Sequence, residues 1–240
     1  MEMEFIGRKR ELQELEERYQ SGRFEMGVIY GARRIGKTSL LKKFSEDKPS
    51  LYFQARESSE LDNRAAFSLT LNRLLGIPYE FIYPTYSEAF DALIRYAGGK
   101  PFVLVLDEIA FLAQSDKAFL SELQFNVDHK FKNTEFKFLL SGSTISFMKD
   151  ILKDNRGPLF QRSTFQMNIR KLYFSDALVF LKGVSIEDKI RYLSMFGEHP
   201  FYLEMIDSKL SFDENITRLL FNRFGNLLDA PDKVLPLASK

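Results

Sequence analysis

The chain of 240 residues contains no cysteine, no tryptophan and only two histidines. The absence of cysteine excludes disulfides, thiolate zinc sites and cysteine nucleophiles. With His129 and His199 alone, a histidine-rich metal site does not fit, and we assign His199 no catalytic role. Any chemistry must therefore use carboxylates, hydroxyls, lysine, arginine and backbone amides.

Long apolar runs are missing as well. No stretch approaches the roughly 20 residues that a membrane-crossing helix needs. The N-terminus, MEMEFIGRKREL, carries charges where a signal peptide has its apolar segment, so we expect a cytoplasmic protein with no membrane partner. A formal net charge of +1 gives no general reason to expect nucleic-acid binding, although a local basic face stays open.

Short apolar runs alternate with amphipathic stretches, which is the pattern of a parallel sheet with helices on both faces. Five runs predict parallel strands: MGVIYG, SLYFQA, PFVLVLDE, EFKFLLSGS and TFQMNIRKL. Between these runs we expect helices near Thr38–Asp47, Asp62–Leu75, Ser87–Ala97, Asp116–Lys132 and Ile145–Lys153. The predicted fold class is α/β, with one large domain at residues 1–172.

The strand pattern ends at residue 172. The stretches SDALVFLKG, SIEDKIRYLSMFGEHPFYLEMI and DENITRLLFNRFG predict helices, the first and last with N-caps Ser175 and Asp213. Pro200 is expected to end one helix and start the next. We expect a small helical subdomain at 173–228. The segment 229–240 has two prolines in DAPDKVLPLASK and no periodic face, which predicts an extended or disordered tail.

A turn between the first strand and the first helix carries the clearest motif. Gly31-x-x-x-x-Gly36-Lys37-Thr38 matches the phosphate-binding loop, in which backbone N–H groups and a helix N-terminus face phosphate oxygens. Lys37 would reach the β and γ phosphates, and Thr38 would bind Mg²⁺. The alternative is a structural glycine turn, which the strand, turn and helix order disfavours.

Two carboxylates end the run PFVLVLDEI. Asp107 and Glu108 follow a buried strand, at the edge where open α/β sheets bind ligands. Asp107 would hold Mg²⁺ through water, and Glu108 would orient or deprotonate an attacking water. The alternative is a strand that ends in a solvated acidic turn.

The extra strand SLYFQA lies between the phosphate loop and the acidic strand, and it implies the strand order 5-1-4-3-2. The predicted fold is therefore a P-loop NTPase three-layer sandwich with a five-stranded parallel sheet. In the branch of P-loop NTPases that has this additional strand, the fourth strand typically ends in a polar residue. Here it ends in Ser141, Gly142 and Ser143, whose hydroxyls could sense the γ phosphate. A Ser-Gly-Ser turn without a ligand is the alternative.

Four further stretches make the chain similar to the STAND-type archaeal ATPases, P-loop proteins of the AAA-like branch. They are FIGRKREL, LLSGSTISFM, GPLFQRS and GEHPFYLEMI. The resemblance implies that the first packs against adenine, that GPLFQRS presents Arg162 toward the phosphates, and that Pro200 belongs to a helical lid. An arginine before a strand also often forms a surface ion pair. The motifs and the resemblance together predict a nucleotide site of Phe5, Ile6, Gly7, Arg8, Gly31, Arg34, Ile35, Gly36, Lys37, Thr38, Ser39, Ser141, Ser143 and Pro200, with Lys37, Glu108 and Arg162 in catalysis.

The chain departs from the family pattern at Ala32, Gln161 and Glu198, none of which is a phosphate ligand. Members of the family usually continue into a winged-helix segment and an effector domain. The resemblance therefore implies an ATPase module without that output region.

Three functions fit these patterns. The first is a slow ATPase that binds ATP or ADP with Mg²⁺ and acts as a conformational switch. The second is an initiator- or loader-like ATPase on DNA, whose DNA-reading element is not in this chain. The third is a small-molecule phosphotransferase, for which no arginine-rich lid is evident. We favour the switch, with a protein partner or self-association left open.

Overall fold

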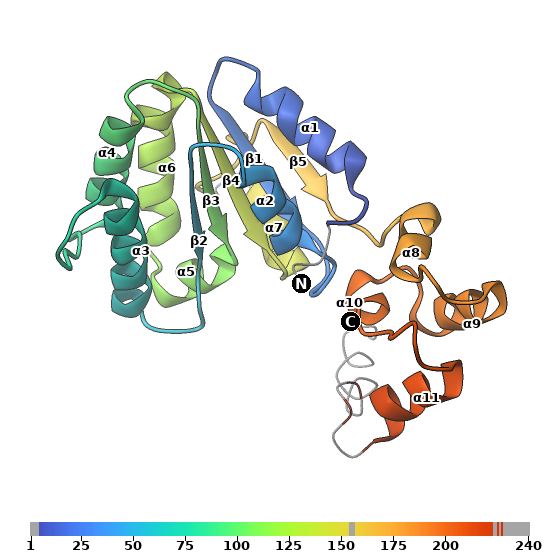
Figure 1. Cartoon of the computed structure of the whole chain (residues 1–240). Helices are drawn as coiled ribbons and strands as arrows, with labels where there is room; N and C mark the ends of the chain where they lie inside the picture. The colour runs from blue at the N-terminus through green and yellow to red at the C-terminus, as the bar shows by residue number, and fades with distance from the viewer. Residues whose placement is uncertain (1–4, 154–156, 223–224, 226, 228–240) are drawn as a thin grey trace. The chain divides into compact units, whose positions relative to one another are not determined.

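The structure, a computed structural model, describes residues 5–153, 157–222, 225 and 227. Two compact units make up the chain (Figure 1). The core unit is Arg8–Arg170, and the helical unit consists of the described residues within 5–7 and 171–227. The tail predicted at 229–240 lies outside the described residues.

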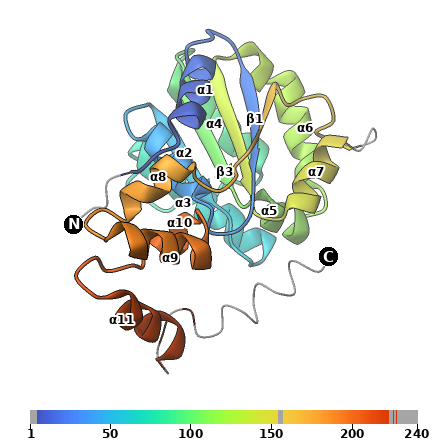
Figure 2. The ribbon, with the colours of Figure 1, turned by 90° about the vertical axis from the view of Figure 1, so that its right-hand side faces the viewer.

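A five-stranded sheet forms the centre of the core unit, and its strands are all parallel in the order β2-β3-β4-β1-β5 (Figures 1 and 2). The strands are β1 Glu25–Tyr30, β2 Ser50–Gln54, β3 Phe102–Asp107, β4 Phe136–Gly142 and β5 Phe165–Asn168. The predicted α/β fold and the order 5-1-4-3-2 are confirmed, since this is the same order counted from the other edge. Strands β3 and β4 are buried along their whole length, which explains their continuous apolar runs.

Helices cover both faces of this sheet. They are α1 Lys9–Tyr19, α2 Lys37–Ser45, α3 Glu60–Leu75, α4 Tyr86–Ala97, α5 Ile109–Ser115, α6 Phe119–His129 and α7 Ile145–Lys153, with a short 3₁₀ turn, η1, at Phe131–Asn133. Helices α3 to α7 share one apolar core with the strands, while α1 and α2 pack together over the other face (Figure 1). The result is three layers.

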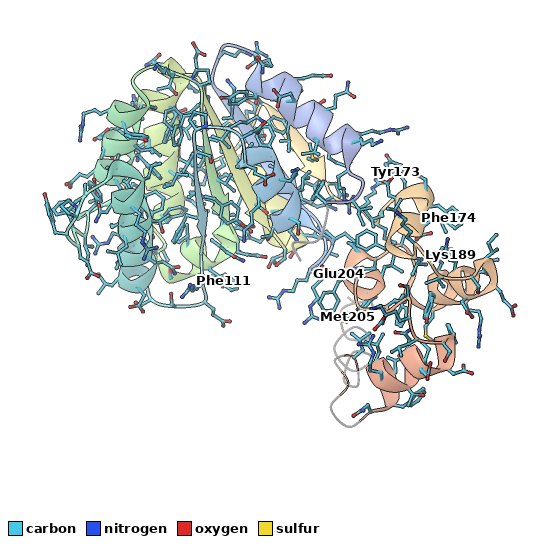
Figure 3. The ribbon with its side chains drawn as sticks, viewed as in Figure 1. Phe111, Tyr173, Phe174, Lys189, Glu204 and Met205 are labelled. Atoms are coloured by element: carbon cyan, nitrogen blue, oxygen red, sulfur yellow. The ribbon has the colours of Figure 1, made fainter. Side chains whose placement is uncertain are left out.

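Phenylalanine rings dominate the larger core. The ring of Phe90 is fully buried and meets the rings of Phe67, Phe131 and Phe138 edge to face. Figure 3 shows side chains filling the space between the sheet and these helices. Burying one such ring contributes about 1.5–3 kcal/mol, so this layer gives the strand ends a firm support.

Helix α1 was not among the predicted helices, although Leu12, Leu15 and Tyr19 recur at helical spacing. Leu15 is its single buried residue. The helix expected at Asp116–Lys132 is broken into α6 and η1, and α5 begins immediately after Glu108. Helices α3 and α4 begin slightly earlier than predicted, where hydroxyl side chains cap their first turns.

The described residues of the helical unit contain helices and no strand. The helices are α8 Phe174–Phe180, α9 Ile186–Phe196, α10 Pro200–Leu203 and α11 Phe212–Ile216, followed by a π-helical turn, η2, at Thr217–Phe221. A small core forms around Tyr192, whose hydroxyl accepts a hydrogen bond from Asn215. Pro200 occupies the first turn of α10, as expected for a residue that lacks an N–H donor.

Both predicted N-caps in this unit are wrong. Helix α8 begins at Phe174 after Tyr173, so Ser175 already lies inside the first turn; both aromatic side chains are largely exposed (Figure 3). Helix α11 is capped by Ser211, not by Asp213, because Ser211 and Glu214 form a reciprocal capping box.

Among the described residues, no helix combines the length and apolar character needed to cross a membrane.

Candidate functional site

The glycine-rich loop lies between the end of β1 and the start of α2. Gly36 caps α2 with φ of 93°, and Arg34 has φ of 62°, both in the left-handed region. A Cβ atom at Gly31 would overlap with the carbonyl oxygen of Ile169, so the loop can pass this neighbour only with glycine. These conformations leave the first N–H groups of α2 without helical acceptors, as anion binding at a helix N-terminus requires.

Lys37 lies inside this loop and is only 5% exposed. Its Nζ donates to the carbonyl oxygens of Gly31 and Ala32, at 2.9 Å each. Burial lowers the pKa of the Lys37 ammonium, and the nearby Glu108 and Asp107 carboxylates oppose that shift. An ammonium has three donors. Within the described part of the chain two of them are used, and the third suits a phosphate oxygen.

Asp107, at the end of β3, is fully buried and joins three elements. Its Oδ2 accepts hydrogen bonds from Thr38 Oγ1 at 2.7 Å and from Tyr52 OH at 2.5 Å. Its Oδ1 accepts from the backbone N–H of Glu108 at 3.0 Å. Burial and the Asp107 charge raise the pKa of Tyr52, so the phenol remains a donor. Tyr52 was not predicted as a site residue, because neither the phosphate-loop motif nor the acidic strand end includes it.

Glu108 follows Asp107 with φ of 55°, a left-handed conformation that costs a non-glycine residue free energy. Its Oε2 accepts hydrogen bonds from the backbone N–H of Ser143 at 3.1 Å and from Ser143 Oγ at 2.9 Å. The end of β4 therefore holds the carboxylate that was predicted to act on water. Glu108 and Ser143, which were predicted separately, are therefore brought together.

Ser141 lies on β4 opposite Ile29 of β1 and is fully buried. Its hydroxyl has no hydrogen-bond partner among the described residues. An unpaired buried hydroxyl is costly, and such groups require an explanation. This one lies at the carboxyl end of the central strand, where the sequence predicts contact with the γ phosphate.

Arg8 connects the loop to the boundary between the units. Its guanidinium donates to the carbonyl oxygen of Ile35 at 2.8 Å and to that of Arg170 at 2.7 Å, and Arg8 is 4% exposed. The resemblance implied an adenine contact for this residue. The structure shows a tie to the glycine-rich loop, a role that the sequence did not reveal.

Backbone strain gathers near these residues. Four described residues other than glycine have positive φ, namely Arg8, Arg34, Glu108 and Gln161. Arg34 lies in the glycine-rich loop, Arg8 donates a hydrogen bond to that loop, and Glu108 follows the end of β3. Such conformations persist where the surroundings impose them, and they concentrate at functional sites.

Arg162 does not join this group, contrary to the predicted phosphate contact. Its guanidinium forms a bidentate pair with Asp128, with N···O distances of 2.7 to 3.1 Å. Thr164, two residues later, hydrogen-bonds to Met26 near the start of β1. Arg162 therefore lies at the edge where the strands begin, roughly 15 Å or more from the glycine-rich loop along β1.

The other predicted residues divide between the units. Ser39 is exposed on the first turn of α2. Phe5, Ile6, Gly7 and Pro200 belong to the helical unit, so their contacts with a nucleotide stay predictions. Within that unit Gly7 passes so close to Asp176 that a Cβ atom would overlap with the carboxylate.

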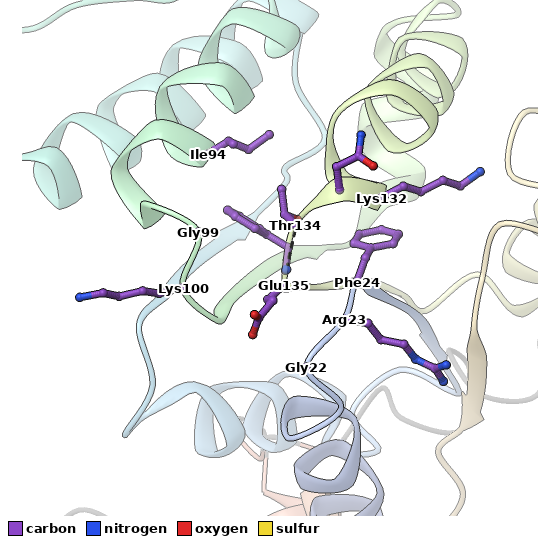
Figure 4. Close-up of a pocket in the computed structure, with 11 residues that line it drawn as sticks. Gly22, Arg23, Phe24, Ile94, Gly99, Lys100, Lys132, Thr134 and Glu135 are labelled. Carbon is purple, nitrogen blue, oxygen red and sulfur yellow. Dashed lines mark hydrogen bonds between the residues drawn. The ribbon is translucent and has the colours of Figure 1, made fainter.

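A surface pocket of about 560 Å³ lies at the opposite edge of the sheet (Figure 4). Phe24, Lys100 and Glu135 are among its lining residues, which come from the segments that precede β1, β3 and β4. It contains none of the predicted site residues. The pocket is therefore separate from the glycine-rich loop.

The residues present fit Mg²⁺. Thr38 and Asp107 supply hard oxygen donors at the N-terminus of α2, the donor type that Mg²⁺ prefers. In the described residues there is no group of three or more Asp, Glu, His or Cys side chains arranged to hold a metal. Mg²⁺ is often bound by one or two protein ligands together with substrate phosphates, and this site suits that mode.

Comparison with known proteins agrees with this geometry. Residues 5–206 match the family described as an ATPase domain predominantly from Archaea. An uncharacterized protein of Methanocaldococcus jannaschii is 30% identical over 219 residues, which cover 90% of this chain and 47% of that protein. The chain thus spans about half the length of this curated relative. An uncharacterized ATP-binding protein of the same organism is 46% identical over 44 residues, or 18% of this chain and 75% of its own length.

Solved structures share the fold. A Walker-type ATPase of Pyrococcus abyssi matches with a TM-score of 0.74 at 19% identity, covering 98% of this chain and 77% of that one. The Aeropyrum pernix ORC1 protein in complex with DNA matches with a TM-score of 0.58 at 14% identity, over 84% and 59% of the two chains. A STAND protein of Pyrococcus horikoshii with a tetratricopeptide repeat sensor matches at 0.55 and 20% identity, over 89% and 32%.

Asp128→Asn should lower the free energy of unfolding by on the order of 1 to 2 kcal/mol near pH 6 and by about half as much near pH 3. The hydrogen bonds from Arg162 hold the pKa of Asp128 at about 2. Because the folded pKa is depressed below the unfolded value of about 3.9, this stability is present above that value and is lost as the pH falls toward the folded pKa.

Urea titrations between pH 6 and pH 3 measure this effect. Asp150→Asn, an exposed carboxylate on α7, serves as the control and should change little at either pH. A difference between wild type and Asp128→Asn that stays constant over this range would contradict the ion pair.

Proposed function

Because the chain belongs to the ATPase domain family that is found predominantly in Archaea, we propose that it binds ATP or ADP with Mg²⁺, hydrolyses ATP slowly and acts as a nucleotide-dependent switch. We assign it to the STAND type in the AAA-like branch. The observation that carries this proposal is the hydrogen-bonded group of Thr38, Asp107, Glu108 and Ser143 beside the glycine-rich loop. It supplies oxygen ligands and a held carboxylate at one edge of the sheet.

Phosphate binding falls to the loop. The N–H groups at the start of α2 and the ammonium of Lys37 donate to the β and γ phosphates of the nucleotide. Thr38 and Asp107 hold Mg²⁺, which when bound neutralises charge that develops on the phosphate oxygens. Ser141, with its unpaired buried hydroxyl, suits a contact with the γ phosphate.

Hydrolysis falls to Glu108. Its carboxylate orients the attacking water and accepts a proton from it. The two hydrogen bonds from Ser143 hold this carboxylate at the end of β4 and share its negative charge. They also link Glu108 to the strand end that is expected to sense the γ phosphate.

The switch rests on Arg8. The chain passes between the two units at residues 7–8 and 170–171, and the Arg8 guanidinium joins both places to the Ile35 carbonyl of the glycine-rich loop. A movement of this loop between the ATP and ADP states would change the geometry at both crossings. Charge-assisted contacts of this kind contribute about 1.5–3 kcal/mol, enough to shift a two-state equilibrium roughly ten- to hundredfold.

The DNA-associated alternative has weaker support. The similarity to the DNA-bound ORC1 protein of Aeropyrum pernix is one of fold at 14% identity. Binding of a phosphate backbone depends on clustered positive charge, whereas this chain has a net charge of +1. We therefore place the switch first, with a protein partner or a second copy of the chain as the receiver of its signal.

Lys37→Ala should weaken binding of Mg-ATP about ten- to hundredfold or more, because it removes the one ammonium inside the loop. Isothermal calorimetry measures this loss. Lys100→Ala is a matched control, since this lysine lines the pocket at the opposite edge of the sheet (Figure 4). Undiminished affinity in folded Lys37→Ala would remove the phosphate-binding assignment.

Glu108→Gln should bind Mg-ATP with near-normal affinity and hydrolyse it at least about a hundredfold more slowly, because an amide cannot accept the proton of water. Single-turnover phosphate release measures the chemical step apart from product release. Glu135→Gln, at the strand-start edge, is the control. Equal rates for both variants would show that Glu108 is not the general base.

Hydrogen exchange tests the switch. Residues 171–222 should differ in amide protection between Mg-ADP and a non-hydrolysable Mg-ATP analogue, and Arg8→Ala should reduce this difference while nucleotide still binds. Lys9→Ala, exposed on α1, is the neighbouring control. Identical protection in the two nucleotide states of wild type, with both nucleotides bound, would leave an ATPase without a switch.

A further inference from the structure

Tyr52 lies on β2, a strand that contributes no residue to the predicted nucleotide site. It is in register with Val105 of β3, two positions before Asp107. Its phenol therefore reaches along the neighbouring strand and donates to Asp107 Oδ2 at 2.5 Å. The ring is also covered by Lys42 of α2, whose Nζ lies 5.4 Å from the ring centroid. The position of the hydroxyl is thus determined by contacts from two elements.

The donors around Asp107 divide its carboxylate in a defined way. Thr38 and Tyr52 both donate to Oδ2, whereas the Glu108 N–H donates to Oδ1. These donors come from α2, β2 and the end of β3, and together they prevent rotation of the carboxylate group. Because the Thr38 hydroxyl uses its proton on Asp107, its lone pairs are left available for a cation.

We propose that Tyr52 is a positioning residue for Mg²⁺: its phenol holds the Asp107 carboxylate in the orientation in which Thr38 and Asp107 together bind the cation of Mg-nucleotide. The proposal rests on the nucleotide binding proposed above. Groups that hydrogen-bond to metal-binding side chains orient them, and their removal typically costs about 10- to 100-fold in metal affinity. Tyr52 touches no phosphate in this arrangement, since it acts through Asp107.

The test is Tyr52→Phe, which keeps the ring and removes only the hydroxyl. With ADP present, the concentration of Mn²⁺ or Mg²⁺ needed for half-saturation should rise about tenfold. Mn²⁺ binding is followed by electron paramagnetic resonance, and Mg²⁺ binding by calorimetry. ADP affinity measured in EDTA should stay unchanged, which a general structural defect would not produce.

Two further variants complete the experiment. Tyr86→Phe removes a buried phenol that has no hydrogen-bond partner among the described residues, and the metal affinity of this variant should equal that of wild type. In an Asp107→Asn background, Tyr52→Phe should add little further loss, because the two side chains act as one unit. Thermal melting of each variant shows that it is folded.

The outcomes separate the two proposals. If wild type binds no Mg-nucleotide, the proposed function fails. If wild type binds it and folded Tyr52→Phe has unchanged or tighter affinity for the cation, the positioning role of Tyr52 is overturned. An equal loss of ADP affinity with and without metal would also overturn it, because the defect would then not act through Asp107.

Discussion

The fully buried carboxylate of Asp107 is the group on which the arrangement of the site depends. A charge without solvent needs donors, and the structure supplies them from α2, β2 and the backbone after β3. The same three hydrogen bonds that satisfy the charge also connect these elements. The stability of the core unit and the geometry of the site therefore depend on the same three hydrogen bonds. A change that removes a donor disturbs the position of the carboxylate as well as its solvation.

Parallel strand order brings the remaining groups to this carboxylate. Strand β4 lies between β3 and β1, so the ends of all three strands meet at one edge. The glycine-rich loop follows β1, Asp107 ends β3, and Ser143 follows β4 and reaches Glu108. The hydrogen bonds from Thr38 to Asp107 and from Ser143 to Glu108 join residues that are 69 and 35 positions apart in the sequence. The phenylalanine layer under α3 to α7 supports the strands that carry them.

Many residues at this edge of the sheet could be predicted from the sequence, because they belong to short local motifs. Gly31 to Thr38 follow a strand and open a helix, and Asp107 ends a continuous apolar run, so strand order alone predicted their proximity. Tyr52 could not be predicted in the same way. A tyrosine in a strand favours sheet structure in general, and its partner lies 55 residues away across a register that only the folded sheet defines.

The contacts of Arg8 and Arg162 could not be predicted from the sequence either. Both arginines lie near a segment boundary, and a motif cannot tell which acceptor a long, flexible side chain will reach. Arg8 donates to the Ile35 carbonyl of the loop, to the Arg170 carbonyl after β5 and to the carboxylate of Glu11. Arg162 donates to the carboxylate of Asp128 at the other edge. The position of the acceptors determines where each guanidinium lies. Asp128 binds the planar guanidinium of Arg162 in a bidentate pair, whereas the carbonyls of Ile35 and Arg170 accept from a guanidinium that is buried between the loop and the end of the sheet. A movement of the glycine-rich loop would therefore act on Arg8, which is hydrogen-bonded to the loop backbone, and not on Arg162.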